Sequence, residues 1–130
     1  MNAEHAAPIL AALRENPNLR VSDGSVKNGT VPPYVVAYIV VATPDGTTLE
    51  DVFDRVVVTA TIHSVGGNAD AVRVIADQVW ASLGGIRPDI AGRDCSRIRL
   101  IDSRPADRDE TTAQVVLNQV DVYQYASVPA

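Results

Sequence analysis

The chain has 130 residues, 46% of them apolar, which suits a single domain over residues 1–130 with a core of its own. A formal net charge of −5 argues against a protein that binds nucleic acid through a net basic surface. The one cysteine, Cys95, excludes an intramolecular disulfide framework. The longest apolar run, Tyr34–Ala42, has about half the length of a membrane-spanning helix, and the N-terminus lacks a secretion signal. We therefore expect a soluble protein without membrane contact.

Two segments precede the first long strand. Residues 8–15 carry three apolar side chains on one side, which predicts a short helix with Pro8 in its first turn. Asn16-Pro17 should end that helix, because the residue before a proline disfavours helical backbone. Residues 18–33 are rich in Ser, Asp, Gly, Asn and Pro and predict a surface loop with at most a short strand at 19–22.

Two strands are predicted next. Tyr34–Ala42 is β-branched and aromatic; because it is apolar on both faces, it must be covered on both sides by its own chain or by another. Residues 43–46, Thr-Pro-Asp-Gly, predict a turn. Residues 55–63 alternate, which predicts a half-buried antiparallel strand. One face would hold Val56, Val58, Ala60 and Ile62, and the other Val57, Thr59, Thr61 and His63.

The clearest helix signal spans residues 69–83. Asn68 is a natural N-cap, Asp70 complements the positive end of the helix, and Gly84-Gly85 allows a left-handed C-cap. Arg73 is expected to form an i,i+4 pair in a charged outer row with Asp70 and Asp77. The predicted apolar face, with Trp80 beside it, consists of Val72, Ile75, Ala76, Val79 and Leu83.

Two further strands are expected toward the C-terminus. Residues 87–110 contain six arginines and six acids; within them, 98–102 predicts a short strand and 105–110 a polar turn. Residues 114–125 predict a long closing strand with a bulge or edge change near 118–119. The expected fold class is therefore α+β, a mainly antiparallel sheet of about four strands packed by a central amphipathic helix and a short N-terminal helix.

No residue pattern points to catalysis. Cys95 lacks a neighbouring base and orienting acid, so we do not expect it to be a nucleophile. His63-Ser64 with Asp54 or Asp70 would supply the residue types of a triad, but no Gly-x-Ser-x-Gly elbow is present. We expect His63 to be a polar residue on an exposed strand face or at a subunit contact.

Metal and cofactor sites are also not expected. The two histidines lack zinc-site spacing, and Asp107, Asp109 and Glu110 lack the pattern of a calcium loop. Gly66-Gly67-Asn68 begins a helix, where free N–H groups attract anions, but it lacks the lysine of a phosphate-binding loop. A helix-entry turn explains these residues without a ligand.

Paired tyrosines suggest either core packing or a subunit contact. Tyr34 and Tyr38 share one face of their strand, and Tyr123 and Tyr125 share one face of the last strand. Tyrosine is enriched at protein interfaces. The residues predicted for a subunit or partner interface are Tyr34, Tyr38, His63, Arg97, Arg99, Arg104, Tyr123 and Tyr125.

The order of these segments resembles a known family. A short N-terminal helix, the strand Pro-Tyr-Val-Val-Ala-Tyr, the run Thr-Ile-His-Ser-Val-Gly-Gly-Asn-Ala leading into an amphipathic helix, and a closing Val-Asp-Val-Tyr strand extend over residues 8–129. Together they are similar to the tail terminator, or tail-completion, proteins of long-tailed bacteriophages. The ten arginines against one lysine fit a GC-rich coding genome, and the resemblance is to phages of actinobacterial hosts.

The resemblance implies a structural virion protein in the neck of the tail, assembled in the host cytoplasm. Such a protein forms a ring, usually a hexamer, that caps the tail tube, ends tube polymerisation and meets the head connector, while DNA passes through the lumen. The mixed-charge residues 87–110 would then contact neighbouring subunits or the tube protein. The alternatives are a head–tail connector stopper, a minor tail protein, or a small homodimeric ligand-binding or enzyme domain.

Overall fold

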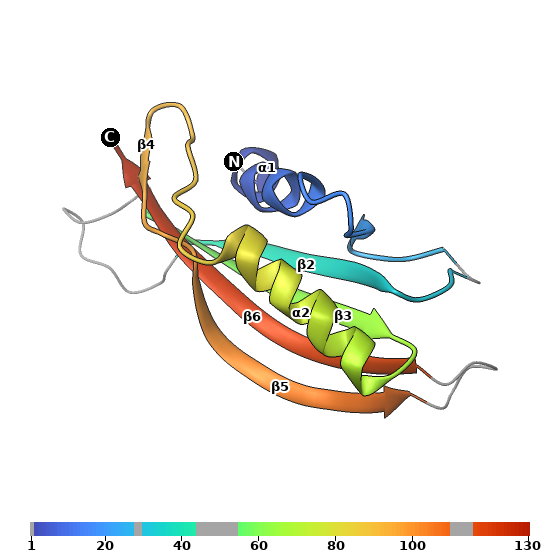
Figure 1. Ribbon diagram of the computed structural model, residues 1–130. Helices are drawn as coiled ribbons and strands as arrows, with labels where there is room; N and C mark the ends of the chain where they lie inside the picture. Colours follow the sequence, from blue (N-terminus) through green and yellow to red (C-terminus); the bar gives the residue numbers. More distant parts are fainter. Residues whose placement is uncertain (1, 28–29, 44–54, 110–115) are drawn as a thin grey trace.

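A computed structural model of the chain describes residues 2–27, 30–43, 55–109 and 116–130 (Figure 1). The predicted α+β class is confirmed, although the sheet has six strands. The elements in chain order are α1 (Asn2–Arg14), β1 (Val21–Asp23), β2 (Tyr34–Ala42), β3 (Val56–Gly66), α2 (Ala69–Leu83), β4 (Arg93–Cys95), β5 (Arg99–Asp109) and β6 (Val116–Pro129).

The sheet is built around the central antiparallel pair β3 and β6. Its path is β1-β2-β3-β6-β4, and β5 also pairs with β6. Both β4 and β5 lie on the same side of β6, because β4 pairs with its last residues and β5 with the stretch before them. The antiparallel prediction is confirmed except at β1, which pairs in parallel with the first half of β2.

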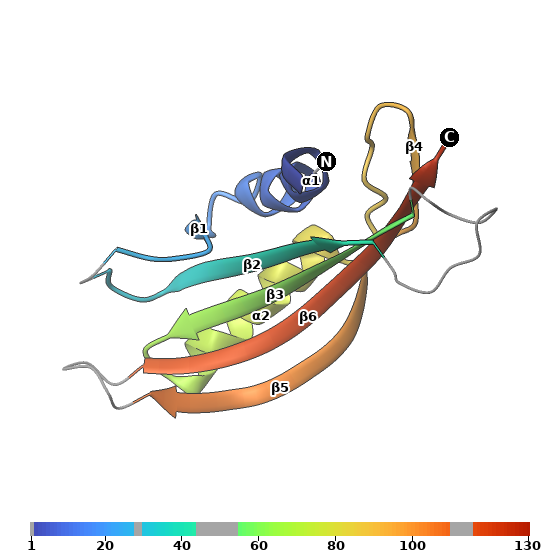
Figure 2. The same ribbon diagram turned by 180° about the vertical axis from the view of Figure 1, so that it is seen from behind.

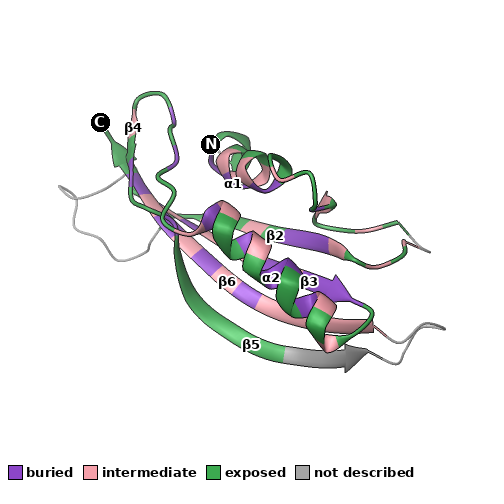
Figure 3. Ribbon diagram, viewed as in Figure 1, coloured by how far each residue is buried: buried purple, intermediate pink, exposed green. Residues whose placement is uncertain are grey.

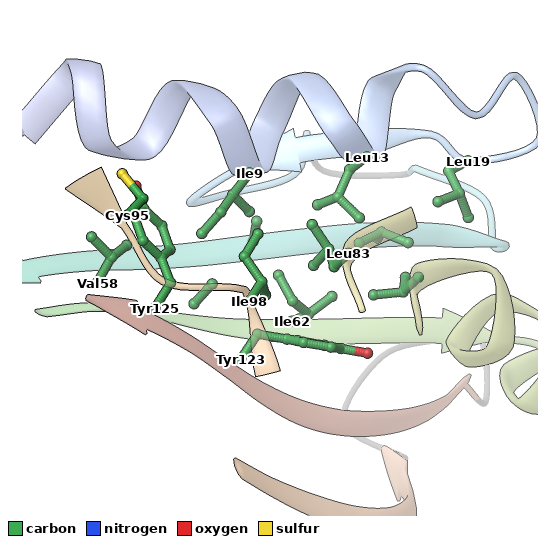
Figure 4. Close-up of a cluster of buried hydrophobic side chains, with 14 of the residues drawn as sticks. Ile9, Leu13, Leu19, Val58, Ile62, Leu83, Cys95, Ile98, Tyr123 and Tyr125 are labelled. Carbon is green, nitrogen blue, oxygen red and sulfur yellow. The ribbon is translucent and has the colours of Figure 1, made fainter. Parts of the chain in front are cut away.

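Both helices cover the same face of the sheet, and the core lies between them and the strands (Figure 1). Figure 4 shows apolar side chains of α1, α2, β3 and β6 meeting there, among them Ile9, Leu13, Ile62 and Leu83. All four of these side chains are fully buried. Within the described residues, neither helix is long and apolar enough to cross a membrane.

The strongest local predictions are confirmed in β3 and α2. In β3, Val56, Val58, Ala60 and Ile62 are fully buried. Helix α2 has the predicted bounds, and its buried residues are the predicted Val72, Ile75, Ala76, Val79 and Leu83. The Asn68 side chain accepts a hydrogen bond from the N–H of Ala71 at 2.8 Å, and Gly85 has a φ of 77°. Arg73 pairs with Asp70 at 3.2 Å, an i,i+3 contact instead of the expected i,i+4 pair.

Helix α1 begins six residues before the predicted start, so the placement of Pro8 in the first turn was wrong. The residues before Pro8 are held by tertiary contacts that local sequence does not reveal. His5 is fully buried, with its Nε2 3.1 Å from the hydroxyl of Ser127, and the hydroxyl of Tyr125 donates to the His5 carbonyl. These contacts hold α1 against the last strand.

The predictions for the C-terminal third need several corrections. Strand β5 runs for 11 residues through the predicted polar turn, and β4 was not predicted. Strand β6 continues to Pro129, and its register with β3 is unbroken past residues 118–119, so the irregularity predicted there is not in β6 itself, although β5 shifts register opposite Val120 and Asn118. The irregularities lie in β5 instead, between Leu100 and Asp102 and between Arg104 and Asp107. Pro105 falls at the second of these, where a proline in an edge strand removes no ladder bond. Residues 44–46 of the turn predicted at 43–46 lie outside the described residues.

Candidate subunit interface

One face of the sheet carries no helix among the residues that the structure describes, and Figure 2 shows this face turned toward the viewer. In β2, Val35 and Ala37 are fully buried under the helices. On the other face Val36 is 5% exposed, whereas Tyr38 and Val40 further along the strand are 45% and 62% exposed. The sequence required cover for both faces of this strand. The described residues leave the second half of the helix-free face uncovered at Tyr38 and Val40.

Tyr38 and His63 lie together on the helix-free face. Their rings meet edge to face with centroids 5.2 Å apart, and the amide of Asn118 donates to Nδ1 of His63 at 3.0 Å. Tyr34 lies on the same face at the start of β2 and is half-buried. This small cluster joins β2, β3 and β6 on the uncovered side.

Two of the predicted arginines share that face. Arg99 lies opposite Gln124 and Arg104 opposite Val120, and both β6 residues point away from the helices. The Arg104 guanidinium is 3.8 Å from Asp102, but both side chains are largely exposed, so the pair adds little stability. Arg97 instead donates to the carbonyl of Gly85 at 2.7 Å and holds the segment that follows α2.

Tyr123 and Tyr125 belong to the core. Each is 1% exposed and points toward the helices, where Tyr125 bonds to His5 and Tyr123 stacks on Trp80 at 6.4 Å. Burial raises the pKa of both phenols above the ordinary value of 10.0, aided by the charge of Asp121 at Tyr123 and by Cys95 at Tyr125. Of the residues predicted for an interface, the exposed ones are therefore Tyr38, Arg97, Arg99 and Arg104.

The two sides of the sheet end in unpaired strand edges. Strand β1 covers β2 only at Val35–Ala37, which leaves the edge of β2 from Tyr38 to Ala42 without a partner strand among the described residues. On the opposite side, β6 is the one partner strand of β5 within the described part of the chain, and residues 99–105 of β5 are all exposed (Figure 3). Unpaired edges of this length template pairing with another chain.

The structure explains the remaining candidate groups without catalysis. Ser64 is fully buried on the helix side, whereas the adjacent His63 lies on the other face, so the two side chains do not work together. Cys95 is buried, and burial raises the pKa of its thiol, the opposite of an activated nucleophile. Within the described ranges, no three His, Cys, Asp or Glu side chains are grouped as metal ligands.

Gly66, shortly before α2, serves packing. A Cβ on Gly66 would lie 3.0 Å from the N–H nitrogen of Val72 and 3.1 Å from the Cβ of Ala71, so only glycine lets the helix start approach the strand end so closely. This contact accounts for a glycine at the position where an anion was considered.

Sequence reasoning missed Trp80 as an exposed feature. The indole is 50% exposed although it lies beside the apolar face of α2. The signal was present in its position, because Trp80 falls outside the buried row of α2 and is followed four residues later by Gly84. A Cβ on Gly84 would come within 2.9 Å of the indole ring, so the glycine makes room for it.

Two comparisons with known proteins give matches. A family model described as "Tail completion protein gp17" matches residues 7–124. A chain from the solved structure "Virion of native gene transfer agent (GTA) particle" superposes with a TM-score of 0.66 and 17% sequence identity, covering 95% of this chain and 93% of that chain. At this sequence identity, the structural match shows that the two chains share a fold. A search of curated proteins gives no match.

Proposed function

Because the chain belongs to the family of tail completion proteins gp17, it is a structural component of a virion tail and not an enzyme, and we propose that it caps the tail tube as a closed ring. In this proposal a hexameric ring forms on the end of the completed tube, stops its polymerisation and offers its other side to the head connector. DNA passes through the lumen. A chain with a net charge of −5 suits a conduit that does not hold phosphates.

The observation that carries the proposal is the pair of unlike free edges on opposite sides of one sheet. One is the outer edge of β5, and the other is the Tyr38–Ala42 edge of β2. A two-fold dimer joins like to like, so it would pair one kind of edge and leave the other open. A head-to-tail contact joins β5 of one copy to β2 of the next and leaves no free edge once the ring closes.

Strand direction supports the same contact. Strands β2 and β6 run one way and β3 and β5 the other, since each neighbouring pair among them is antiparallel. When copies are related by rotation about an axis parallel to the strands, equivalent strands of all copies run in the same direction. Strand β5 of one copy then meets β2 of the next in antiparallel fashion, and the alternation continues around the ring.

The exposed polar groups supply contacts that orient the ring. In this proposal Arg99 and Arg104, with Tyr38 and His63 on the same face, contact neighbouring subunits or the tube protein, and Arg97 does so beside the end of α2. Charged groups at such contacts fix register and partner choice more than they add affinity.

The test is the mass of the purified chain by light scattering over a concentration series, with electron micrographs, alone and with isolated tail tubes. A closed ring, or a monomer that forms rings only on tube ends, is expected. A compact dimer that never binds tubes would overturn the proposal. A ring that binds head connectors but not tubes would favour a stopper instead.

A matched set of variants separates docking from folding. Replacement of Arg97, Arg99 and Arg104 by Gln should weaken ring formation or tube binding while the chain stays folded. Arg73→Gln is the control, because Arg73 is also an exposed arginine but lies on α2 beside Asp70. Equal assembly of the triple variant and the control would remove the arginines from the interface.

A further inference from the structure

A half-exposed tryptophan stands beside one free edge of the sheet. Trp80 is the only tryptophan of the chain, and its ring stacks on Tyr123 of β6 with an interplanar angle of 26°. Next to Tyr123 in the sheet lies Leu100 of β5, which is 40% exposed. Trp80 is held from two sides, by Tyr123 and by the backbone of Gly84, so its exposed half is a fixed apolar projection.

A hollow lies beside the other free edge. Its volume is about 420 Å³, and its walls come from α1, β1 and the unpaired part of β2. The small side chains of Ala3 and Ala6 leave space above the strand on the helix side. The lining residues are Asn2, Ala3, Ala6, Asp23 and Ile39 to Val41.

The register of the sheet places the projection and the hollow at the same level. Ile39 lies opposite Ala60, Ala60 opposite Tyr123, and Tyr123 opposite Leu100. One straight row across the four strands therefore begins at the hollow, beside Ile39, and ends at Leu100, next to the Tyr123 on which Trp80 stacks. Both features also lie on the helix side of the sheet, since α1 and α2 cover the same face (Figure 1).

We infer that Trp80 of one copy packs into the hollow beneath α1 of the next copy, where β5 pairs with the Tyr38–Ala42 edge. This inference rests on the proposed ring and names its central contact. Neighbouring strands lie about 4.8 Å apart, so extending the row by one strand brings Ile39 of the next copy directly beside Leu100. A tryptophan that fills a pocket on the partner is among the side chains that contribute most to the binding free energy of an interface.

The single tryptophan gives a direct readout. On assembly of the wild-type chain, its fluorescence emission should shift to shorter wavelength and its quenching by acrylamide should fall, because the exposed half of the ring leaves water. Trp80→Ala should raise the subunit concentration needed for half-assembly by about tenfold or more, the effect of losing an interface hot spot. Val74→Ala is its control, since Val74 is 53% exposed on the same helix but does not belong to the contact.

The second arm changes the hollow and leaves Trp80 in place. Ala3→Arg puts a long charged side chain into the hollow, whereas Ala7→Arg puts it on α1 beside a different groove, lined by Pro8, Ala11 and Ile90. Both alanines are exposed, so both variants should fold. Ala3→Arg should lose assembly and the emission shift, and Ala7→Arg should keep both.

The outcomes separate this contact from the ring itself. Rings that form without an emission shift, or equal assembly of Ala3→Arg and Ala7→Arg, would overturn the contact and leave the ring standing. A wild-type chain that forms no ring even with tail tubes present would overturn both.

Discussion

Ser127→Ala should release the N-terminal helix from the end of the sheet. Ser127 is 1% exposed, and its hydroxyl joins three elements: it bonds to Nε2 of His5 in α1 at 3.1 Å and accepts from Nε of Arg93 in β4 at 2.7 Å. The bond from Arg93 to the Ser127 carbonyl, at 3.1 Å, survives the substitution. The variant therefore isolates the hydroxyl.

The magnitude follows from the two bonds lost. A neutral hydrogen bond contributes about 1 kcal/mol and one to a charged donor about 1.5 to 3 kcal/mol, but Arg93 is partly exposed and regains water. We expect the free energy of unfolding to fall by about 2 to 3 kcal/mol, equivalent to about 10 °C in Tm for a domain of this size. Urea unfolding measures the first quantity and calorimetry the second.

Hydrogen exchange and a matched serine test the location of the effect. Amide exchange in α1 should speed up more than exchange in α2, since of the two helices only α1 is bonded to this hydroxyl. Ser82→Ala is the control, because the Ser82 hydroxyl bonds only to the Gln78 carbonyl of its own helix, at 2.9 Å. A loss below about 0.5 kcal/mol for Ser127→Ala, or one equal to that of the control, would refute the reasoning.

Two further predictions concern the start of α2 and alkaline pH. Asn68→Ala removes the cap bond to Ala71 and should cost about 1 kcal/mol in urea unfolding, whereas Asn68→Asp should retain most of the stability. Burial raises the folded-state pKa of Tyr123 and Tyr125 above 10.0, and of Cys95 above 9.0. At neutral pH these groups are protonated in both the folded and the unfolded chain, so their burial contributes its full stabilisation there. Stability should fall as pH rises past 9 to 10, and a urea midpoint that stays constant up to pH 11 would contradict this assignment.

The sequence predicted those elements whose signals are local. For α2, the cap at Asn68, the spacing of its apolar residues and the glycines after Leu83 all lie within 20 residues, and its bounds were correct. The early start of α1 depends on Ser127 and Tyr125, more than a hundred residues away. No pattern near Pro8 could indicate that contact, so tertiary packing decided where the helix begins.

The same limit applies to β5. Its start falls in the predicted strand at 98–102, but its later residues have little strand character of their own, with Pro105 among charged neighbours, and they form a strand because β6 offers a free edge. Pro105 lies at the second of the two register shifts in β5, between Arg104 and Asp107. Pairing partners at long range therefore overrode a local turn signal.

The sequence could not show which of the tyrosines proposed for the interface are exposed. Alternation shows which tyrosines share a face, but it does not show which face the helices cover, so Tyr38 and Tyr123 have the same signature in the sequence. The helices settle the difference, because they bury Tyr123 and leave Tyr38 at 45% exposure. In the proposed ring, the outer edge of β5 pairs with the Tyr38–Ala42 edge of β2 in the next copy. Both edges have the strand direction that such a contact needs, and this match is why we propose a ring for this fold.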